Sequence, residues 1–143
     1  HVLGINVTTS IPAKLSMEQT IHNIHEAGGV AIAAHPTAFY KSPASRKVTC
    51  YDAVEVMNAA SFPFPVLTHY SKKFAEKLNL PQTGGSDSHY APEIGSAYTV
   101  VESEKDINEI AKAIIRGSTI PVGKGIPLKV WMKRSISRLK KES

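Results

Sequence analysis

The chain has 143 residues, of which 42% are hydrophobic and 20% charged, a balance that is typical of a single globular domain and excludes an intrinsically disordered chain. No run approaches the roughly 18 apolar residues that a membrane-spanning helix needs, so we expect no membrane partner. The single cysteine, Cys50, excludes a disulfide within the chain and predicts a reducing compartment, the cytoplasm. The net charge of +5 comes from residues 127–143, because acidic and basic side chains balance over residues 1–126.

The amino-terminal part predicts a strand and then a helix. Apolar β-formers over Val2–Val7 predict a strand that has His1 at its beginning. Ser16 and Gln19 form a capping box, which opens a helix over Met17–Ala27. In a parallel arrangement, His1 would lie away from the carboxyl ends of the strands, where groups that do chemistry collect.

Two further strands are each followed by a polar side chain. Small and β-branched residues over Val30–Ala34 predict a buried strand that ends at His35. A second strand over Tyr51–Met57 ends at Asn58 and carries Glu55 within it. His35 and Asn58 are therefore placed where site residues are expected, and Glu55 is either a ligand or base or a structural hydrogen-bonding residue.

The segment 37–49 between these strands holds Lys41 and Arg46 among serine, proline and alanine residues. A loop of this length in a compact domain is often functional. Positive side chains beside a metal would bind phosphate, because arginine binds two phosphate oxygens at once. We predict phosphate contacts for Lys41 and Arg46, with a solvated loop as the alternative.

A glycine-rich turn carries the strongest chemical signal. Gly84 and Gly85 allow the backbone to turn after a short apolar run. Asp87 and His89 follow, and in an extended segment side chains two residues apart point the same way. A carboxylate oxygen and an imidazole nitrogen together suit a divalent metal. A turn or cap role for Asp87 is the alternative.

The rest of the chain alternates helices with strands, which predicts a parallel α/β arrangement. A helix is expected over Val66–Leu78 with Tyr70 on its apolar face, and a second helix is expected to end at Arg116. Strands are expected over Ile94–Glu102 and Thr119–Val122. The last stretch, residues 128–141, predicts a basic amphipathic helix, which is either a solvated face or a surface for weak nucleic-acid contact.

Four motifs in this order resemble the PHP (polymerase and histidinol phosphatase) superfamily of metal-dependent phosphoesterases. They are His1 to Gly4, Ala34 to Pro36, Asp52 to Asn58 and Gly85 to His89. The resemblance implies an α/β fold that forms the later portion of a distorted seven-stranded (β/α) barrel. The family carries further ligands ahead of these motifs, one of them a glutamate, so a structural role is favoured for Glu55. We expect residues 1–126 to be the C-terminal part of a PHP-type domain, with its N-terminal half as a partner, and residues 127–143 to be a basic amphipathic helix.

The resemblance also implies divalent metal ions, up to three in the complete domain, which would be zinc, manganese or iron. His1 and His35 would share one ion, Asp87 would bind a second and His89 would bind the third. Water that the metal activates would then attack the phosphorus of a substrate, so no protein nucleophile is needed.

The predicted function is therefore the hydrolysis of a small phosphate monoester or a nucleotide by a metal-dependent phosphoesterase. Lys41, Arg46 and Asn58 are the predicted substrate-binding residues. The alternative is a non-catalytic PHP module that scaffolds a protein or nucleic-acid partner, with residues 127–143 as the docking helix.

Overall fold

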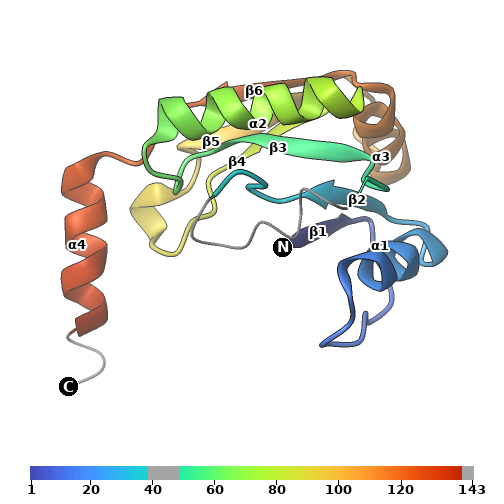
Figure 1. The fold of residues 1–143 in the computed structure, drawn as a ribbon, viewed down its shortest axis with the longest axis horizontal. Coiled ribbons are helices and arrows are strands. Elements are labelled where there is room, and N and C mark those ends of the chain that lie inside the picture. The colour runs from blue at the N-terminus through green and yellow to red at the C-terminus, as the bar shows by residue number, and fades with distance from the viewer. Residues whose placement is uncertain (39–48, 140–143) are drawn as a thin grey trace.

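The structure, a computed structural model, describes residues 1–38 and 49–139, with the side chains of residues 134–139 excepted. Helices and strands alternate along most of this length (Figure 1). In chain order the elements are β1 (Val2–Ile5), α1 (Met17–Glu26), β2 (Val30–Ala33), β3 (Ala53–Asn58), α2 (Phe64–Leu78), β4 (Gln82–Gly85), η2 (Ala91–Glu93), β5 (Ala97–Val101), α3 (Ile107–Arg116), β6 (Thr119–Gly123) and α4 (Leu128–Leu139).

The larger sheet has four strands in the order β1-β2-β3-β4. β2, β3 and β4 are parallel, as predicted, whereas β1 runs antiparallel to β2, so the parallel prediction is wrong for β1. The connection after β1 turns twice through left-handed residues, Asn6 (φ 60) and Lys14 (φ 64), and α1 then returns the chain alongside β1. As a result Val2 lies opposite Ala33, and the beginning of β1 is beside the carboxyl end of β2.

The smaller sheet pairs β5 with β6 and is also antiparallel, which again departs from the prediction. Glu102 N donates a hydrogen bond to the carbonyl oxygen of Ser118, so the chain leaves α3 beside the end of β5 and enters β6 there. Threonine side chains connect this sheet to β4, because Thr99 Oγ1 donates to the carbonyl oxygen of Gly84 and Thr119 Oγ1 donates to that of Gln82. The described residues are thus of mixed α/β class, as predicted, and they do not form a closed barrel.

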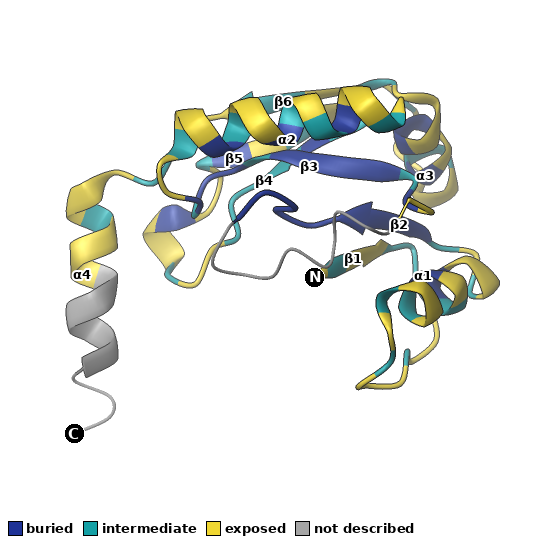
Figure 2. Cartoon of the chain, viewed as in Figure 1, coloured by how far each residue is buried: buried dark blue, intermediate teal, exposed yellow. Residues whose placement is uncertain are grey.

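The core lies around β2 and β3, which are the darkest strands in Figure 2. All four residues of β2 are buried, and Val54 and Val56 of β3 are completely or almost completely buried. Ile21 of α1 packs in the same cluster as Val54 and Val56, whereas Ile114 of α3 packs in a second cluster with Val30 and Ala53. A strand that is buried in this way reads as a continuous apolar run, which is why the sequence predicted β2 well.

Helix α2 packs against the sheet through part of the predicted apolar face, since Leu67 is buried and Phe74 contacts the core, but the prediction is wrong for Tyr70. Its buried residues are Leu67, Ser71 and Ala75, and Tyr70 is 49% exposed. Small residues on the inner face allow close packing on β3, and Ser71 Oγ is hydrogen-bonded to Thr37 Oγ1 at 2.6 Å. Within the described residues no helix is both long enough and apolar enough to cross a membrane.

Candidate metal and phosphoester site

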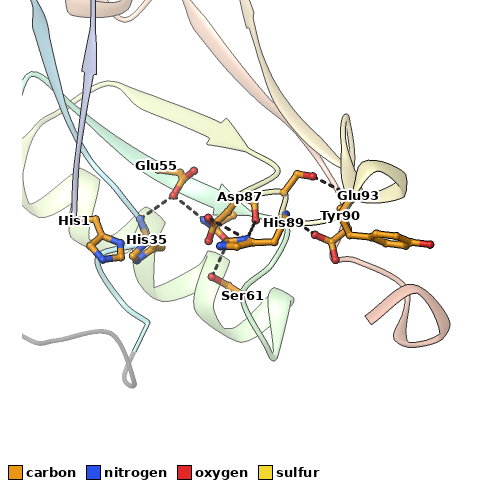
Figure 3. Close-up of polar contacts among 10 residues, drawn as sticks. His1, His35, Glu55, Ser61, Asp87, His89, Tyr90 and Glu93 are labelled. Atoms are coloured by element: carbon orange, nitrogen blue, oxygen red, sulfur yellow. Dashed lines mark hydrogen bonds and ion pairs between the residues drawn. The ribbon is translucent and has the colours of Figure 1, made fainter. Parts of the chain in front are cut away.

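The carboxyl ends of β2, β3 and β4 bring together most of the residues that the sequence singled out (Figure 3). His35 lies two residues beyond the end of β2, and Asn58 is the last residue of β3. Asn58 is paired with Gly85, the last residue of β4, and Ala59 N donates to the carbonyl oxygen of Gly85 at 3.0 Å. Asp87 lies two residues beyond Gly85. This edge of the sheet, together with the residues that follow β4 as far as Glu93, is called the site edge below.

His1 and His35 are in direct contact at the site edge. His1 Nδ1 and His35 Nε2 are 3.0 Å apart, and the two rings meet edge to face with their centroids separated by 4.9 Å. His35 is 7% exposed, whereas His1 is exposed. The antiparallel direction of β1 explains this contact, because it places the beginning of β1 beside the end of β2. The expectation that His1 would lie away from the site edge is therefore wrong.

Glu55 of β3 holds the backbone of His35. The carboxylate is 4% exposed, and its Oε2 accepts a hydrogen bond from His35 N at 2.8 Å and another from Asn58 Nδ2 at 3.0 Å. His35 has a φ of 33°, a left-handed conformation that a non-glycine residue adopts only when its surroundings hold it there. The structural hydrogen-bonding role favoured for Glu55 is therefore observed.

Gly85 makes room for the Glu55 side chain. A Cβ atom at position 85 would lie 2.7 Å from Glu55 Oε1, closer than side-chain carbons come to other atoms in proteins. A side chain at position 85 would therefore require the buried carboxylate to move. The sequence predicted a turn at this glycine, which is wrong, because Gly85 is the last residue of β4 and the turn follows it.

Both polar atoms of the Asn58 side-chain amide are hydrogen-bonded. Nδ2 donates to Glu55, Oδ1 accepts from Ser61 Oγ at 3.2 Å, and the residue is 5% exposed. These bonds connect the end of β3 to the turn before α2. The predicted contact of Asn58 with substrate stays a prediction.

Asp87 and His89 are arranged by the turn after β4 rather than by an extended strand. Asp87 has a φ of 48°, so the rule that side chains two residues apart point the same way does not apply. His89 Nδ1 donates to the carbonyl oxygen of Asp87 at 2.8 Å and lies 4.0 Å from Asp87 Oδ1. Because a carbonyl oxygen only accepts, Nδ1 carries the proton and the lone pair of His89 is on Nε2, the arrangement found in metal-binding histidines.

Glu93 is a site-edge residue that the sequence analysis missed. Its side chain is completely buried, and Oε2 accepts a hydrogen bond from His89 N at 2.9 Å. It lies in η2, a single turn of 3-10 helix that begins at Ala91, and so short an element has no periodic pattern to reveal it. Glu93 thus fixes the backbone of His89, as Glu55 fixes that of His35.

The distance between the His1 and His35 ring nitrogens suits two ligands of one divalent ion. Two nitrogens that each bind zinc at about 2.0–2.1 Å in tetrahedral geometry are about 3.3 Å apart, close to the 3.0 Å between His1 Nδ1 and His35 Nε2. Across residues 1–38 and 49–139, however, no group of three or more histidine, cysteine, aspartate or glutamate side chains is close enough to hold an ion. The predicted phosphate-binding residues Lys41 and Arg46 lie outside the described residues.

Residues 69–119 match the family model described as PHP-associated. The matched segment begins in α2 and ends at the first residue of β6. It includes Asp87 and His89, whereas His1 and His35 lie before it.

Among solved structures, this chain is similar to PsfC from Pseudomonas syringae PB-5123, whose crystal structure superimposes with a TM-score of 0.64 at 20% sequence identity. The similarity covers 91% of this chain and 54% of the PsfC chain, so this chain spans about half the length of that protein. At this identity the similarity shows the fold alone. No curated protein matches the chain.

Proposed function

We propose that this chain, whose match over residues 69–119 is consistent with the C-terminal part of a PHP superfamily domain, takes part in the metal-dependent hydrolysis of a phosphate ester. The observation that carries the proposal is the contact between His1 and His35, which come from different strands and whose nitrogens are 3.0 Å apart beside a buried carboxylate network. Imidazole pairs of this kind are common ligands of zinc, manganese and iron.

Each predicted ligand has a role in this proposal. His1 and His35 bind one ion together, Asp87 offers a carboxylate to a second, and His89 offers Nε2 to a third. A bound divalent ion would lower the pKa of a water molecule toward neutrality and offset the negative charge that develops on the phosphoryl oxygens. Glu55 positions His35 by accepting its backbone N–H, so the imidazole is presented from a fixed backbone.

The substrate class we propose is a small phosphate monoester or a nucleotide. Lys41 and Arg46 are the proposed phosphate-binding cations, with Asn58 as a further contact. We also propose that the strands described here belong to a PHP-type barrel, that the N-terminal half of the domain is a partner, and that the protein is cytoplasmic, since Cys50 is a free, exposed thiol.

Hydrolysis of an aryl phosphate in the presence of Mn²⁺ tests this proposal. We expect His35→Ala and Asp87→Ala to lower kcat/KM at least about 100-fold, because each removes a ligand. His22→Ala and His69→Ala are the matched controls, since both residues are exposed on helices away from the site edge. Full activity in both site variants would contradict the proposal.

A second candidate function is a non-catalytic module that scaffolds a partner through α4. In Figure 1 this helix projects away from the two sheets, and its described lysines, Lys129 and Lys133, are exposed. Nucleic-acid binding through these charges would weaken steeply with salt. Filter binding of single-stranded DNA by the protein and by its Lys129→Glu/Lys133→Glu variant separates this candidate from the first, because it predicts a loss of binding with no change in hydrolysis.

A further inference from the structure

An apolar pocket of about 170 Å³ lies beside the site edge and has no role in the proposal above. Part of its lining comes from residues 59–61 and Phe62, between β3 and α2, and from Phe64, the first residue of α2. The lining is completed by Gly125 and Ile126 and, in α4, by Leu128 and Trp131. These residues are called the ring pocket below.

The main chain fixes two sides of the ring pocket relative to each other. Ile126 N donates to the carbonyl oxygen of Ala59 at 2.9 Å, which joins the segment before α4 to the turn after β3. A Cβ atom at Gly125 would lie 2.7 Å from the Cβ atom of Phe64, so the backbone at Gly125 packs directly on that side chain. The pocket is therefore part of the packed structure. It opens to solvent, because Phe62 and Trp131 are 75% and 44% exposed.

Hydrogen bonds connect the ring pocket to the site edge. Ser61, a lining residue, donates from Oγ to Asn58 Oδ1, and Asn58 in turn donates to Glu55 Oε2, which binds His35 N. Ala59, also a lining residue, donates its N–H to the carbonyl oxygen of Gly85. A molecule in the pocket would therefore contact the residues that immediately follow β3. The candidate metal ligands His35, Asp87 and His89 follow the two neighbouring strands, β2 and β4.

The size and lining of the pocket match one aromatic ring. An apolar cavity of about 150 Å³ accommodates a single benzene ring, and aromatic walls favour stacked or edge-to-face contacts with it. Among the described lining residues, the Ser61 hydroxyl and the indole N–H of Trp131 are the only side-chain polar groups. So few polar groups favour a hydrocarbon ring over a nucleobase, whose several donors and acceptors would lose their hydrogen bonds to water.

We propose that the ring pocket binds the aromatic ring of the substrate, so that the substrate class is a phosphate monoester of a compound with a single aromatic ring. This inference rests on the proposed phosphoesterase function for the phosphate part of the ligand, but the binding of the ring depends only on the pocket. Ser61 bridges the two parts by contacting the ring pocket on one side and Asn58 on the other.

Trp131 is the only tryptophan of the chain and lies in the pocket, so its fluorescence reports binding directly. We expect phenylphosphonate, which is not hydrolysed, to shift the emission to shorter wavelength and to bind at least about tenfold more tightly than methylphosphonate, because the ring removes apolar surface from water. Benzyl alcohol, which has no phosphorus, is expected to cause the same shift at higher concentration.

Two variants and one control test whether the ring occupies this pocket. Phe62→Ala removes a mostly exposed wall, and Ala60→Leu fills the pocket, so we expect each to reduce the preference for phenylphosphonate over methylphosphonate at least about fivefold. Ile120→Ala, which truncates another mostly exposed apolar residue, on β6 outside the pocket, is expected to leave it unchanged. Far-UV circular dichroism checks that each variant is folded.

The results distinguish this inference from the function on which it rests. A Trp131 shift with benzyl alcohol that the two pocket variants lose supports the ring pocket even if no phosphate ester is hydrolysed. Equal affinity for phenylphosphonate and methylphosphonate, or a preference that Phe62→Ala leaves intact, overturns the inference even if hydrolysis is observed.

Discussion

Two carboxylates, Asp52 just before β3 and Glu55 within it, each accept a hydrogen bond from the backbone of β2 or of the residues that follow it. At the amino end, Asp52 Oδ2 accepts hydrogen bonds from Ala31 N at 2.7 Å and from His25 Nε2 at 2.8 Å. At the site edge, Glu55 Oε2 accepts them from His35 N and Asn58 Nδ2. Asp52 and His25 are partly exposed, whereas Glu55 is 4% exposed.

The two carboxylates differ less in their hydrogen bonds than in the backbone conformation of the residues that they bind. Ala31 lies within a regular strand, so Asp52 only satisfies a strand N–H. His35 has a left-handed backbone, and so does Asp87 across the site edge. Strained, buried and polar arrangements of this kind concentrate where a protein binds ligands. The two carboxylates therefore have similar hydrogen-bonding roles, and the one at the site edge holds the backbone of a candidate metal ligand, His35.

The largest effect is expected from Glu55→Ala. It leaves the buried N–H groups of His35 and Asn58 without their acceptor, which costs about 1–3 kcal/mol for each, so the free energy of unfolding should fall by about 3 kcal/mol or more. Urea denaturation measures this decrease in the free energy of unfolding. Glu76→Ala, on the exposed side of α2, is the control and should change stability by less than about 0.5 kcal/mol. A Glu55→Ala variant as stable as this control would contradict the proposed structural role of Glu55.

Gly85→Ala should be the next most harmful change. The new methyl group would overlap Glu55 Oε1 and displace the carboxylate, at a cost of about 1–3 kcal/mol. If the carboxylate is the cause, the cost of Gly85→Ala measured by urea denaturation should shrink when Glu55→Ala is already present. Equal costs in the two backgrounds would show that another contact is responsible.

Asp52→Ala should have a smaller effect than Glu55→Ala. It removes the acceptor of Ala31 N and the partner of His25, but water reaches this end of the sheet, so the expected loss is about 1–2 kcal/mol. The same denaturation measurement applies. A loss that equals or exceeds that of Glu55→Ala would remove the difference between the two ends of β3.

The smallest expected effect at neutral pH concerns Tyr51, next to Asp52. Burial, followed by the charges of Cys50 and Glu18, raises the pKa of the Tyr51 phenol to about 12. The unfolded chain loses this proton near pH 10, before the folded protein does, so stability should decrease as the pH rises from about 10 to 12. Tyr51→Phe should abolish this part of the pH dependence, which denaturation at pH 9 and pH 11 would measure. An unchanged slope would show that other groups cause it.

Local patterns were sufficient for much of the fold. The capping box at Ser16 and Gln19 forms as predicted, with Ser16 Oγ accepting from Gln19 N and Gln19 Oε1 accepting from Ser16 N. β2 lies close to its predicted range and α3 ends at Arg116 as predicted, followed by Gly117 with a φ of 77°. These features depend on residues within a few positions of each other.

Features that depend on distant residues were predicted less well. The direction of β1 depends on its pairing with β2, whose residues lie far along the chain, and no local pattern encodes it. Tyr70 was assigned to the inner face of α2 because it is apolar, yet Ser71 is buried there through its hydrogen bond to Thr37. Likewise, the bond from His35 N to Glu55 joins positions twenty residues apart. The sequence singled out His35, Asp87 and His89 as candidates, but their hydrogen-bond geometry required the structure.

The most direct test of the account is the equilibrium affinity for Zn²⁺, measured by competition with a chromophoric chelator. Three proteins are compared, namely the wild type, His35→Ala/His89→Ala at the site edge, and His22→Ala/His69→Ala on exposed helix positions. The account predicts that the site-edge variant binds Zn²⁺ at least about tenfold more weakly, while the helix variant binds like the wild type. Equal affinity in all three proteins would contradict it.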